Sequence, residues 1–315
     1  MFNKLSTKTL LITFFVLLVL VLAFVIFEPN QGESNFNSKI VNIDTAKVTS
    51  ISIYPQSTHH QEVKLYKEGR DWYVKLKNNK NALVPDTKIK SLIGQLIAIK
   101  PKSVAAQSEN KWAEYKVDSN ATNVKVFEGN KNTLDLHIGK FAFQRPRTML
   151  SYIRVNNDEN VYQVEGMLSM AFNQNWNYFR DNSLLNGDFT DWDTLSFQYP
   201  SDSSFTLVKK NKHWFLNGSK TDSAASASFL RNLRYSRSTD FVDNFDQSIL
   251  TDPVYTLDIK SKSVPVRIQA FKNGTDLLIH SNGNPQSYFN GSKGKLWQKI
   301  FIGKEKLFPK KKSKK

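Results

Sequence analysis

A long apolar segment lies near the N-terminus. From Leu10 to Phe27 the chain consists of Leu, Ile, Phe and Val, interrupted only by Thr13 and Ala23, and it carries no charge. A helix of this length measures about 27 Å, close to the ~30 Å hydrocarbon core of a bilayer. Glu28-Pro29 follows, rather than the small residues of a signal-peptide cleavage site. The pattern therefore predicts an uncleaved transmembrane helix at 10–27, with a cleaved signal peptide as the alternative.

Charged residues predict the orientation of this helix. Lys4 and Lys8 precede it and Glu28 follows it. Because positively charged flanks stay in the cytoplasm, we expect residues 1–9 inside and the rest of the chain outside. A linker at 28–43 then joins the anchor to the exposed region. The functional part of the chain is thus predicted to be extracytoplasmic.

Beyond the linker, one order of elements occurs twice. Each copy starts with an alternating strand, around Ile51 in the first and Leu195 in the second, and continues through a second strand and a turn to a tryptophan. Trp72 and Trp214 therefore hold the same place in a repeated hairpin. We interpret both as structural core residues rather than as platforms for stacking sugars, because a buried aromatic ring contributes a large apolar area.

An amphipathic helix follows each tryptophan. Apolar residues recur every four positions after Asp86 and after Asp222, which places them on one face of a helix. Both aspartates are predicted to cap the first turn by accepting hydrogen bonds from backbone N–H groups. Tyr152 and Tyr288 have the same separation along the chain as the two aspartates. This shared offset predicts that the two tyrosines occupy matching strands.

Further alternating segments predict antiparallel strands in both copies. They lie at 124–127, 134–138, 151–155 and 161–164 in the first copy, and at 254–259, 266–271, 277–280, 287–289 and 296–300 in the second. Apolar residues at helical spacing between the copies predict one linking helix, within a linking helix and loop at 165–190. The predicted fold class is α+β: an N-terminal transmembrane helix, then two tandem repeats of antiparallel sheet plus helix at 44–164 and 191–309, and a basic tail at 310–315.

The composition excludes several classes of function. Of the 315 residues 40% are hydrophobic and none is cysteine, which argues against a disordered chain, disulfide frameworks, thiolate metal sites and cysteine nucleophiles. The five histidines are scattered, and the sequence contains no phosphate-binding loop and no nucleophile motif. We therefore expect no metal, no cofactor and no catalysis. The clustered acids Asp181, Asp188, Asp191 and Asp193 leave an envelope hydrolase, with its site between the repeats, as the alternative.

Basic residues are the strongest candidates for a binding site. The chain carries 44 Lys+Arg against 28 Asp+Glu, a net charge of +16. Guanidinium groups suit carboxylates and phosphates, although cations near a helix C-terminus are also favoured by the helix dipole alone. The anion-binding candidates are Arg145, Arg147, Arg231, Arg234 and Arg237. The candidates for contact with an anionic membrane surface are the tail residues Lys310, Lys311, Lys312, Lys314 and Lys315.

Several short segments stand in a characteristic order along the chain. They are Gly69–Trp72, Pro85-Asp86, Ala113–Tyr115, His137–Lys140, Tyr152–Arg154 and Phe179–Asp181. Together with the single N-terminal span, this order resembles the bacterial domain-of-unknown-function family numbered 4340. The resemblance implies an envelope protein of unestablished activity, of a kind linked to ATP-binding-cassette transport systems associated with gliding motility. It implies no catalytic residues.

These features together predict a location and a general role. We expect a single-span protein of the bacterial inner membrane, with its N-terminus in the cytoplasm and its bulk in the periplasm. The predicted role is binding or scaffolding, as an accessory to a transport or gliding-related envelope system. The expected partners are the membrane, an envelope protein such as a transporter, and an anionic lipid or polyanion, but not nucleic acid. A polyanion- or glycan-binding module that uses the arginines is the second alternative.

Overall fold

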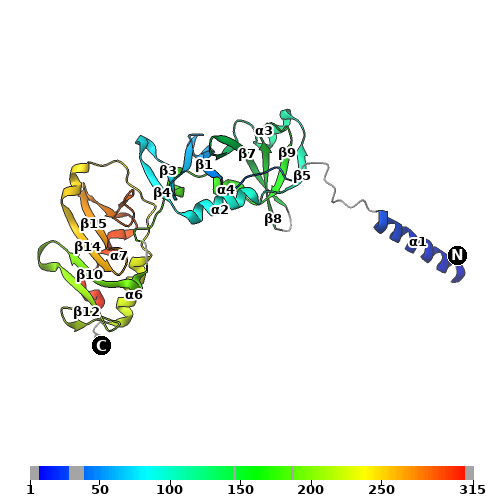
Figure 1. Cartoon of the computed structure of the whole chain (residues 1–315). Coiled ribbons are helices and arrows are strands. Elements are labelled where there is room, and N and C mark those ends of the chain that lie inside the picture. Colours follow the sequence, from blue (N-terminus) through cyan, green and yellow to red (C-terminus); the bar gives the residue numbers. More distant parts are fainter. Residues whose placement is uncertain (1–6, 28–38, 145–146, 186–187, 309–315) are drawn as a thin grey trace.

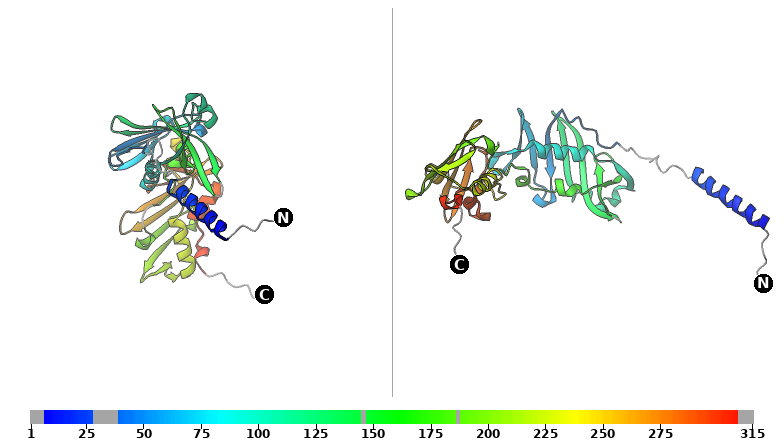
Figure 2. Two further views of the ribbon diagram at one scale, coloured as in Figure 1. Left: turned by 90° about the vertical axis from the view of Figure 1, so that its right-hand side faces the viewer. Right: turned by 90° about the horizontal axis from the view of Figure 1, so that it is seen from below.

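The chain forms two antiparallel sheets, each packed against helices. The computed structural model describes residues 7–27, 39–144, 147–185 and 188–308. Figures 1 and 2 show the two sheets as separate halves placed end to end, with α2 along one face of the first sheet and α6 against the second. The predicted α+β fold class is therefore confirmed.

The first sheet has nine strands among the described residues, in the spatial order β4-β3-β2-β1-β6-β7-β8-β9-β5. Its strands are β1 (Val48–Tyr54), β2 (Val63–Glu68), β3 (Asp71–Lys75), β4 (Asn81–Val84), β5 (Pro101–Ala106), β6 (Thr122–Glu128), β7 (Lys131–Gln144), β8 (Thr148–Val155) and β9 (Val161–Glu165). The helices of this half are α2 (Asp86–Ile97), α3 (Trp112–Tyr115), α4 (Leu168–Phe172) and α5 (Trp176–Phe179). Buried residues of α2, α4, α5 and most of these strands form one apolar core, and Val104 of β5 packs against it. Helix α3 contributes no buried residue.

The second sheet has eight strands in the described part of the chain, in the spatial order β13-β12-β11-β10-β14-β15-β16-β17. Its strands are β10 (Trp192–Gln198), β11 (Phe205–Lys210), β12 (His213–Leu216), β13 (Ser219–Lys220), β14 (Pro253–Ser261), β15 (Val266–Asn273), β16 (Asp276–Ser281) and β17 (Tyr288–Asn290). Its helices are α6 (Ser223–Arg234) and α7 (Leu296–Ile300). A second, separate apolar core lies beneath them.

The two sheets share one connectivity. In both, four strands run from the centre to one edge, a helix follows, and four later strands run from the centre to the other edge. The edge strand β5 pairs with β9 in the first sheet, and a single bridge from Phe241 to Phe289 of β17 takes the corresponding place in the second. This order matches β9 with β17. The predicted match of Tyr152 with Tyr288 is therefore wrong, because Tyr152 lies on β8.

The segment 296–300 is helical, which corrects its prediction as a strand. It forms α7, and Leu296 and Ile300 are both buried in the second core. These two residues are four positions apart and so face the same side of a helix. A five-residue segment is too short for the periodicity of its apolar residues to separate a helix from a strand.

The predicted linking helix is two short helices, α4 and α5, separated by the non-helical residues 173–175. Leu168, Phe172 and Phe179 of these helices are buried in the first core. The segment therefore belongs to the first half. It does not form a separate connector between the two halves.

The structure places the two tryptophans alike, but only one of the two aspartates caps its helix. Trp72 on β3 and Trp214 on β12 are both buried, each in the core of its own half. Asp222 is the N-cap residue of α6, and its Oδ1 accepts a hydrogen bond from the backbone N–H of Ala225 at 2.7 Å. Asp86 does not cap α2: Pro85 holds the N-cap position, and Asp86 is an exposed first-turn residue without a capping hydrogen bond. Proline at that position already fixes the backbone entry into the helix.

This difference predicts unequal stability effects. Asp222→Ala is expected to lower the free energy of unfolding by about 1 kcal/mol because it removes a cap. Asp86→Ala is the matched control and should change it by less than about 0.5 kcal/mol, since only a screened interaction with the helix dipole is lost. Urea denaturation of both variants measures the difference. Equal losses would contradict the assignment of the caps.

The N-terminal helix α1 covers Thr7–Phe27. Of its side chains the structure describes those of Lys8, residues 11–19 and Val21. Among the described residues, no helix combines the length and the hydropathy needed to cross a membrane. The single-span anchor therefore stays a prediction.

Candidate anion-binding site

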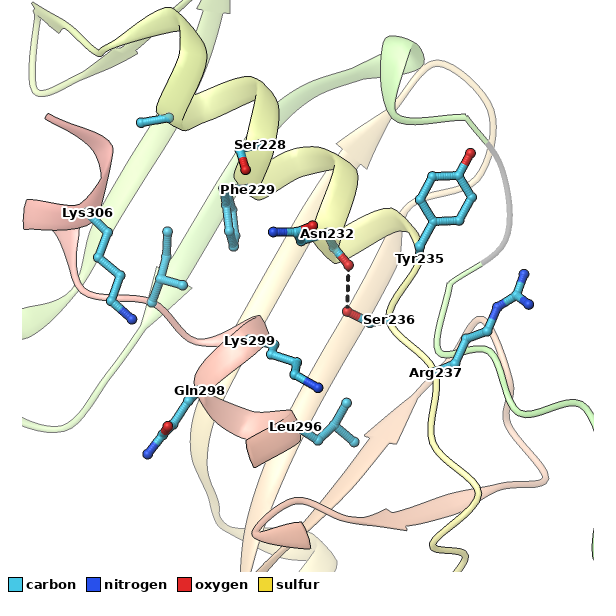
Figure 3. Close-up of a pocket in the computed structure, with 12 residues that line it drawn as sticks. Ser228, Phe229, Asn232, Tyr235, Ser236, Arg237, Leu296, Gln298, Lys299 and Lys306 are labelled. Atoms are coloured by element: carbon cyan, nitrogen blue, oxygen red, sulfur yellow. Dashed lines mark hydrogen bonds between the residues drawn. The ribbon is translucent and has the colours of Figure 1, made fainter. Parts of the chain in front are cut away.

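A pocket lies between α6 and α7 in the second half (Figure 3). Its volume is about 670 Å³. Phe229 of α6 and Leu296 of α7 contribute apolar floor, and Ile302 adds to it from the segment after α7. Each helix turns its apolar face toward the sheet. Polar residues of both helices therefore line the hollow between them.

Basic side chains surround this floor. Arg237, Lys299 and Lys306 line the pocket, and no lining residue is acidic. Figure 3 shows Lys299 extending from α7 into the space between the helices, whereas the guanidinium group of Arg237 points away from Lys299. Within the described part of the chain, none of the three cations forms an ion pair. The hollow is therefore a region of uncompensated positive charge above an apolar surface.

Polar uncharged groups complete the lining. Ser228 and Asn232 of α6 and Gln298 of α7 are exposed along the hollow. Ser236 donates a hydrogen bond from Oγ to the carbonyl oxygen of Asn232 at 3.1 Å, so its hydroxyl hydrogen is already used. The amides of Asn232 and Gln298 both donate and accept hydrogen bonds. They suit a ligand that carries hydroxyl groups beside its anionic groups.

The structure does not bring the predicted arginines together. Arg237 lines the pocket, while Arg231 is exposed on the last turn of α6 outside it. Arg234 donates a hydrogen bond to the carbonyl oxygen of Leu185 at 3.2 Å and so supports the adjoining loop. Arg147 is exposed at the start of the turn into β8, in the other half. Arg145 and the tail lysines 310–315 lie outside the described residues.

Lys299 and Lys306 were not predicted from the sequence. Lys299 lies on α7, a segment that the sequence predicts as a strand, and Lys306 lies on the short turn after it, where the sequence predicts no element. The signal for Lys299 is the helical spacing of Leu296 and Ile300, because a helix that buries these two residues leaves Lys299 exposed beside them. The prediction of Lys299 thus depended on a segment whose secondary structure was predicted wrongly.

Outside the pocket, a further cationic residue lies at the junction of the two halves, and its side chain is fully buried. Arg180 follows α5, and its Nη1 lies 2.9 Å from both carboxylate oxygens of Asp243. Its guanidinium carbon is 3.8 Å from the ring centroid of Phe241. Burial lowers the pKa of Arg180, and the carboxylate of Asp243 opposes that shift. The ion pair of Arg180 with Asp243 therefore joins the two halves, and Arg180 does not line the pocket.

The clustered acids of the hydrolase alternative make local contacts. Asp188 caps a short turn by accepting a hydrogen bond from the backbone N–H of Thr190 at 3.0 Å. Asp181 accepts hydrogen bonds from both the N–H and the hydroxyl of Ser183. Among the described residues no group of three or more His, Asp or Glu side chains is placed to hold a metal ion. The absence of catalysis stays a prediction.

Two histidines have perturbed pKa values, and both are explained by burial. Burial lowers the pKa of His137 to about 4, with Arg154 adding to the shift and Asp135 opposing it. Burial also lowers the pKa of His280, whose ring packs against Tyr288 with centroids 4.5 Å apart. His137 is therefore neutral near pH 7. Neither histidine lines the pocket between α6 and α7.

The family model described as "Domain of unknown function (DUF4340)" matches residues 72–258, more than half of the chain. The chain belongs to the DUF4340 family. The DUF4340 match begins in β3 and ends in β14, so it includes the junction at Arg180 and the α6 side of the pocket. Lys299 and Lys306 lie beyond the DUF4340 match. No curated protein and no solved structure matches the chain.

Proposed function

We propose that this DUF4340 protein is a membrane-anchored, extracytoplasmic binding protein whose ligand carries anionic groups. The observation that carries the proposal is the pocket between α6 and α7, where Arg237, Lys299 and Lys306 surround an apolar floor without any acidic lining residue. Its volume of about 670 Å³ lies within the range of small-molecule sites. Cations that are free of ion pairs bind carboxylate, phosphate or sulfate groups without first breaking an internal contact.

The ligand class follows from the proposed location. Outside the cytoplasm the abundant anions are envelope polymers and lipid headgroups, and nucleic acid is scarce. The exposed amides of Asn232 and Gln298 favour a hydroxyl-rich anionic glycan within this class. Binding of this kind needs no positioned acid, base or nucleophile, in keeping with the expected lack of catalysis.

The anchor is supported by the sequence and by exposure. Leu10–Phe27 carries no charge. The described side chains of its bulky apolar residues include Phe14 and Phe15, which are 61% and 55% exposed, so the described part of the chain does not cover them. Apolar side chains on all sides of one helix suit lipid better than water. We place residues 1–9 in the cytoplasm because Lys4 and Lys8 flank the helix on that side.

The pocket predicts a specific binding defect. The double variant Lys299→Gln/Lys306→Gln should weaken binding of tripolyphosphate, used as a polyanion probe, by about tenfold, because two charge-assisted contacts are lost. Isothermal titration calorimetry on the full chain in detergent measures the affinity. The matched control Lys210→Gln/Lys262→Gln removes the same charge at exposed positions outside the pocket. If both variants bind as the unmodified chain does, or lose affinity equally, the pocket is not the site.

We also propose that the two halves are copies of one unit. Their strand order and the position of the helix after the fourth strand support this origin. Superposition should pair Trp72 with Trp214 and α2 with α6. The hollow beside α2 differs in charge, because the acid Asp86 lies among its basic lining residues Lys67, Arg70 and Lys90. Binding would then be a property that only the second copy acquired.

The family resemblance supports an envelope partner, and a transporter is the class we propose. Two sheets on one anchor, which we propose to bind rather than to catalyse, suit a subunit that presents a ligand to a membrane complex. Crosslinking in native membranes, followed by identification of the captured protein, tests this part of the proposal. Capture of no membrane protein at all would count against it.

A further inference from the structure

The hairpin of β7 and β8 ends in a cluster of exposed apolar side chains. Phe141, Phe143 and Met149 are 57%, 60% and 47% exposed, and Met170 of α4 is 63% exposed. We call these four residues the hairpin patch. Large apolar side chains gathered at one place on a surface mark a binding site more often than isolated ones do.

The strand register places the patch on one face of the hairpin. Phe143 pairs with Met149 across the two strands, and Phe141 pairs with Ser151. Paired residues share a face, and so do residues two apart on a strand. The backbone N–H of Leu168 donates a hydrogen bond to Ser151 Oγ at 3.1 Å, so α4, which carries Met170, begins against the same face. The opposite face is covered, since Leu150 is buried.

The end of the hairpin is basic as well as apolar. The sequence from 139 to 150 contains Lys140, Arg145 and Arg147 and no acidic residue. Arg147 is exposed. Lys140 lies over the rings of Tyr115 and Tyr152 on the other face of the hairpin, with Nζ 4.8 and 5.5 Å from their centroids, so Arg147 is the described cation beside the patch. Exposed aromatic side chains next to an uncompensated cation match the two layers of an anionic bilayer surface, where headgroups lie above acyl chains.

The position of the hairpin suits this surface. Strands β7, β8, β9 and β5 form the end of the first sheet that is farther from the second half (Figure 1). Only residues 28–38 separate α1 from the first described residue of this half. A fully extended segment of that length reaches at most about 40 Å. If α1 is in the bilayer, the first half is held within that distance of the lipid surface.

We propose that the β7–β8 hairpin is a second membrane contact, in which the hairpin patch enters the interface of an anionic bilayer and Arg147 binds its headgroups. The tether rests on the anchor proposed above, whereas the patch and its charge do not depend on it. A protein partner would need an apolar pocket, surrounded by acidic residues, whose shape matches the patch. An anionic bilayer offers apolar acyl chains below acidic headgroups without needing a matching shape. We therefore choose the bilayer as the binding partner of this surface.

The absence of cysteine allows a direct test. Gln144→Cys, next to the patch, carries a nitroxide spin label in the full chain, reconstituted into vesicles of phosphatidylcholine with or without phosphatidylglycerol. Collision with oxygen reports lipid, and collision with a water-soluble nickel complex reports water. Val16→Cys in α1 tests the anchor, and Ser203→Cys on the second half is the aqueous control.

We expect a lipid-like signal at position 144 only when phosphatidylglycerol is present. Arg147→Glu should reduce the lipid-like fraction about fivefold or more, because a cation near the anionic surface is lost. The double variant Phe141→Ser/Phe143→Ser should abolish it, while the far-UV circular dichroism and the thermal unfolding of the chain stay unchanged, which shows an intact fold in both halves.

The failures can be told apart. An aqueous signal at position 144 with a lipid signal at position 16 overturns the hairpin contact and leaves the anchor standing. The reverse pattern overturns the anchor alone. Shielding of position 144 from both reagents identifies a protein contact, and a lipid signal without phosphatidylglycerol removes the role of charge; either result overturns the proposal.

Discussion

Replacing Asp243 with alanine is expected to lower the free energy of unfolding by about 3 kcal/mol. Asp243 is the carboxylate partner of Arg180, whose side chain is fully buried. Two further nitrogens of that arginine, Nε and Nη2, are buried without hydrogen-bond partners in the described part of the chain. Without Asp243 the remaining contacts are Asn177 Oδ1 at 3.2 Å and the ring of Phe241. A buried charge would then be left with no opposite charge.

The same substitution, Asp243→Ala, should also make the two halves unfold independently. Arg180 follows helices that pack in the first core, and Asp243 lies between α6 and β14. Lys80 crosses the junction at the same point, donating a hydrogen bond from Nζ to the carbonyl oxygen of Asp243 at 2.9 Å. With the ion pair removed, urea unfolding should broaden or split into two transitions.

A matched control exists for this prediction. Asp240→Ala removes an acid from the same segment whose partner Lys293 is 4.0 Å away and exposed, so the loss should be below about 1 kcal/mol. The double variant Arg180→Met/Asp243→Ala should recover most of the stability, because no unpaired charge remains. Equal losses for Asp240→Ala and Asp243→Ala, or no recovery in the double variant, would contradict this role of the pair.

Gly139→Ala is expected to destabilise the protein by about 3 kcal/mol, the upper end of what overpacking usually costs. A Cβ atom at Gly139 would lie 2.2 Å from the carbonyl oxygen of Tyr115 and 2.9 Å from that of Lys116. Both are backbone atoms at the end of α3 and cannot rotate away as a side chain can. The pairing of β7 with β8 is also irregular between Ile138 and Phe141. Only glycine lets the strand approach α3 this closely.

Gly94→Ala is the control for the glycine prediction. Gly94 lies within α2, and a Cβ atom there has no atom within 4 Å. Alanine should stabilise the helix by about 0.5–1 kcal/mol. Thermal and urea unfolding of both variants give the comparison. A Gly139→Ala variant as stable as Gly94→Ala would show that the chain near α3 moves aside without cost.

Local patterns were enough to predict much of the fold. Alternation of apolar residues identifies β6, β14 and β15 because each strand has one buried face, as the burial of Val124 and Val126 shows. The cap at Asp222 follows from the apolar period behind it. The same reasoning is wrong at Asp86, because the proline before it fixes the helix start without any side-chain hydrogen bond. A prediction from spacing alone cannot separate these two cases.

The candidate site was harder to predict because it depends on long-range contacts. Arg237 and Lys299 are brought to one hollow only by the packing of α6 against α7, and the strand prediction at 296–300 excluded that packing. Arg180 and Asp243 are 63 positions apart, and nothing in either local sequence indicates the other. The need for glycine at position 139 likewise arises from the backbone of α3, which is distant in sequence.

The proposed extracytoplasmic binding function requires that the two sheets lie outside the cytoplasmic membrane, and this location can be measured directly. Because the chain contains no cysteine, single Ser6→Cys and Ser203→Cys variants can each be labelled at one position with a membrane-impermeant maleimide. If the chain is anchored as proposed, intact spheroplasts should label Ser203→Cys fully and Ser6→Cys only after lysis. Labelling of Ser203→Cys only after lysis would place the pocket in the cytoplasm and contradict the proposed extracytoplasmic binding function.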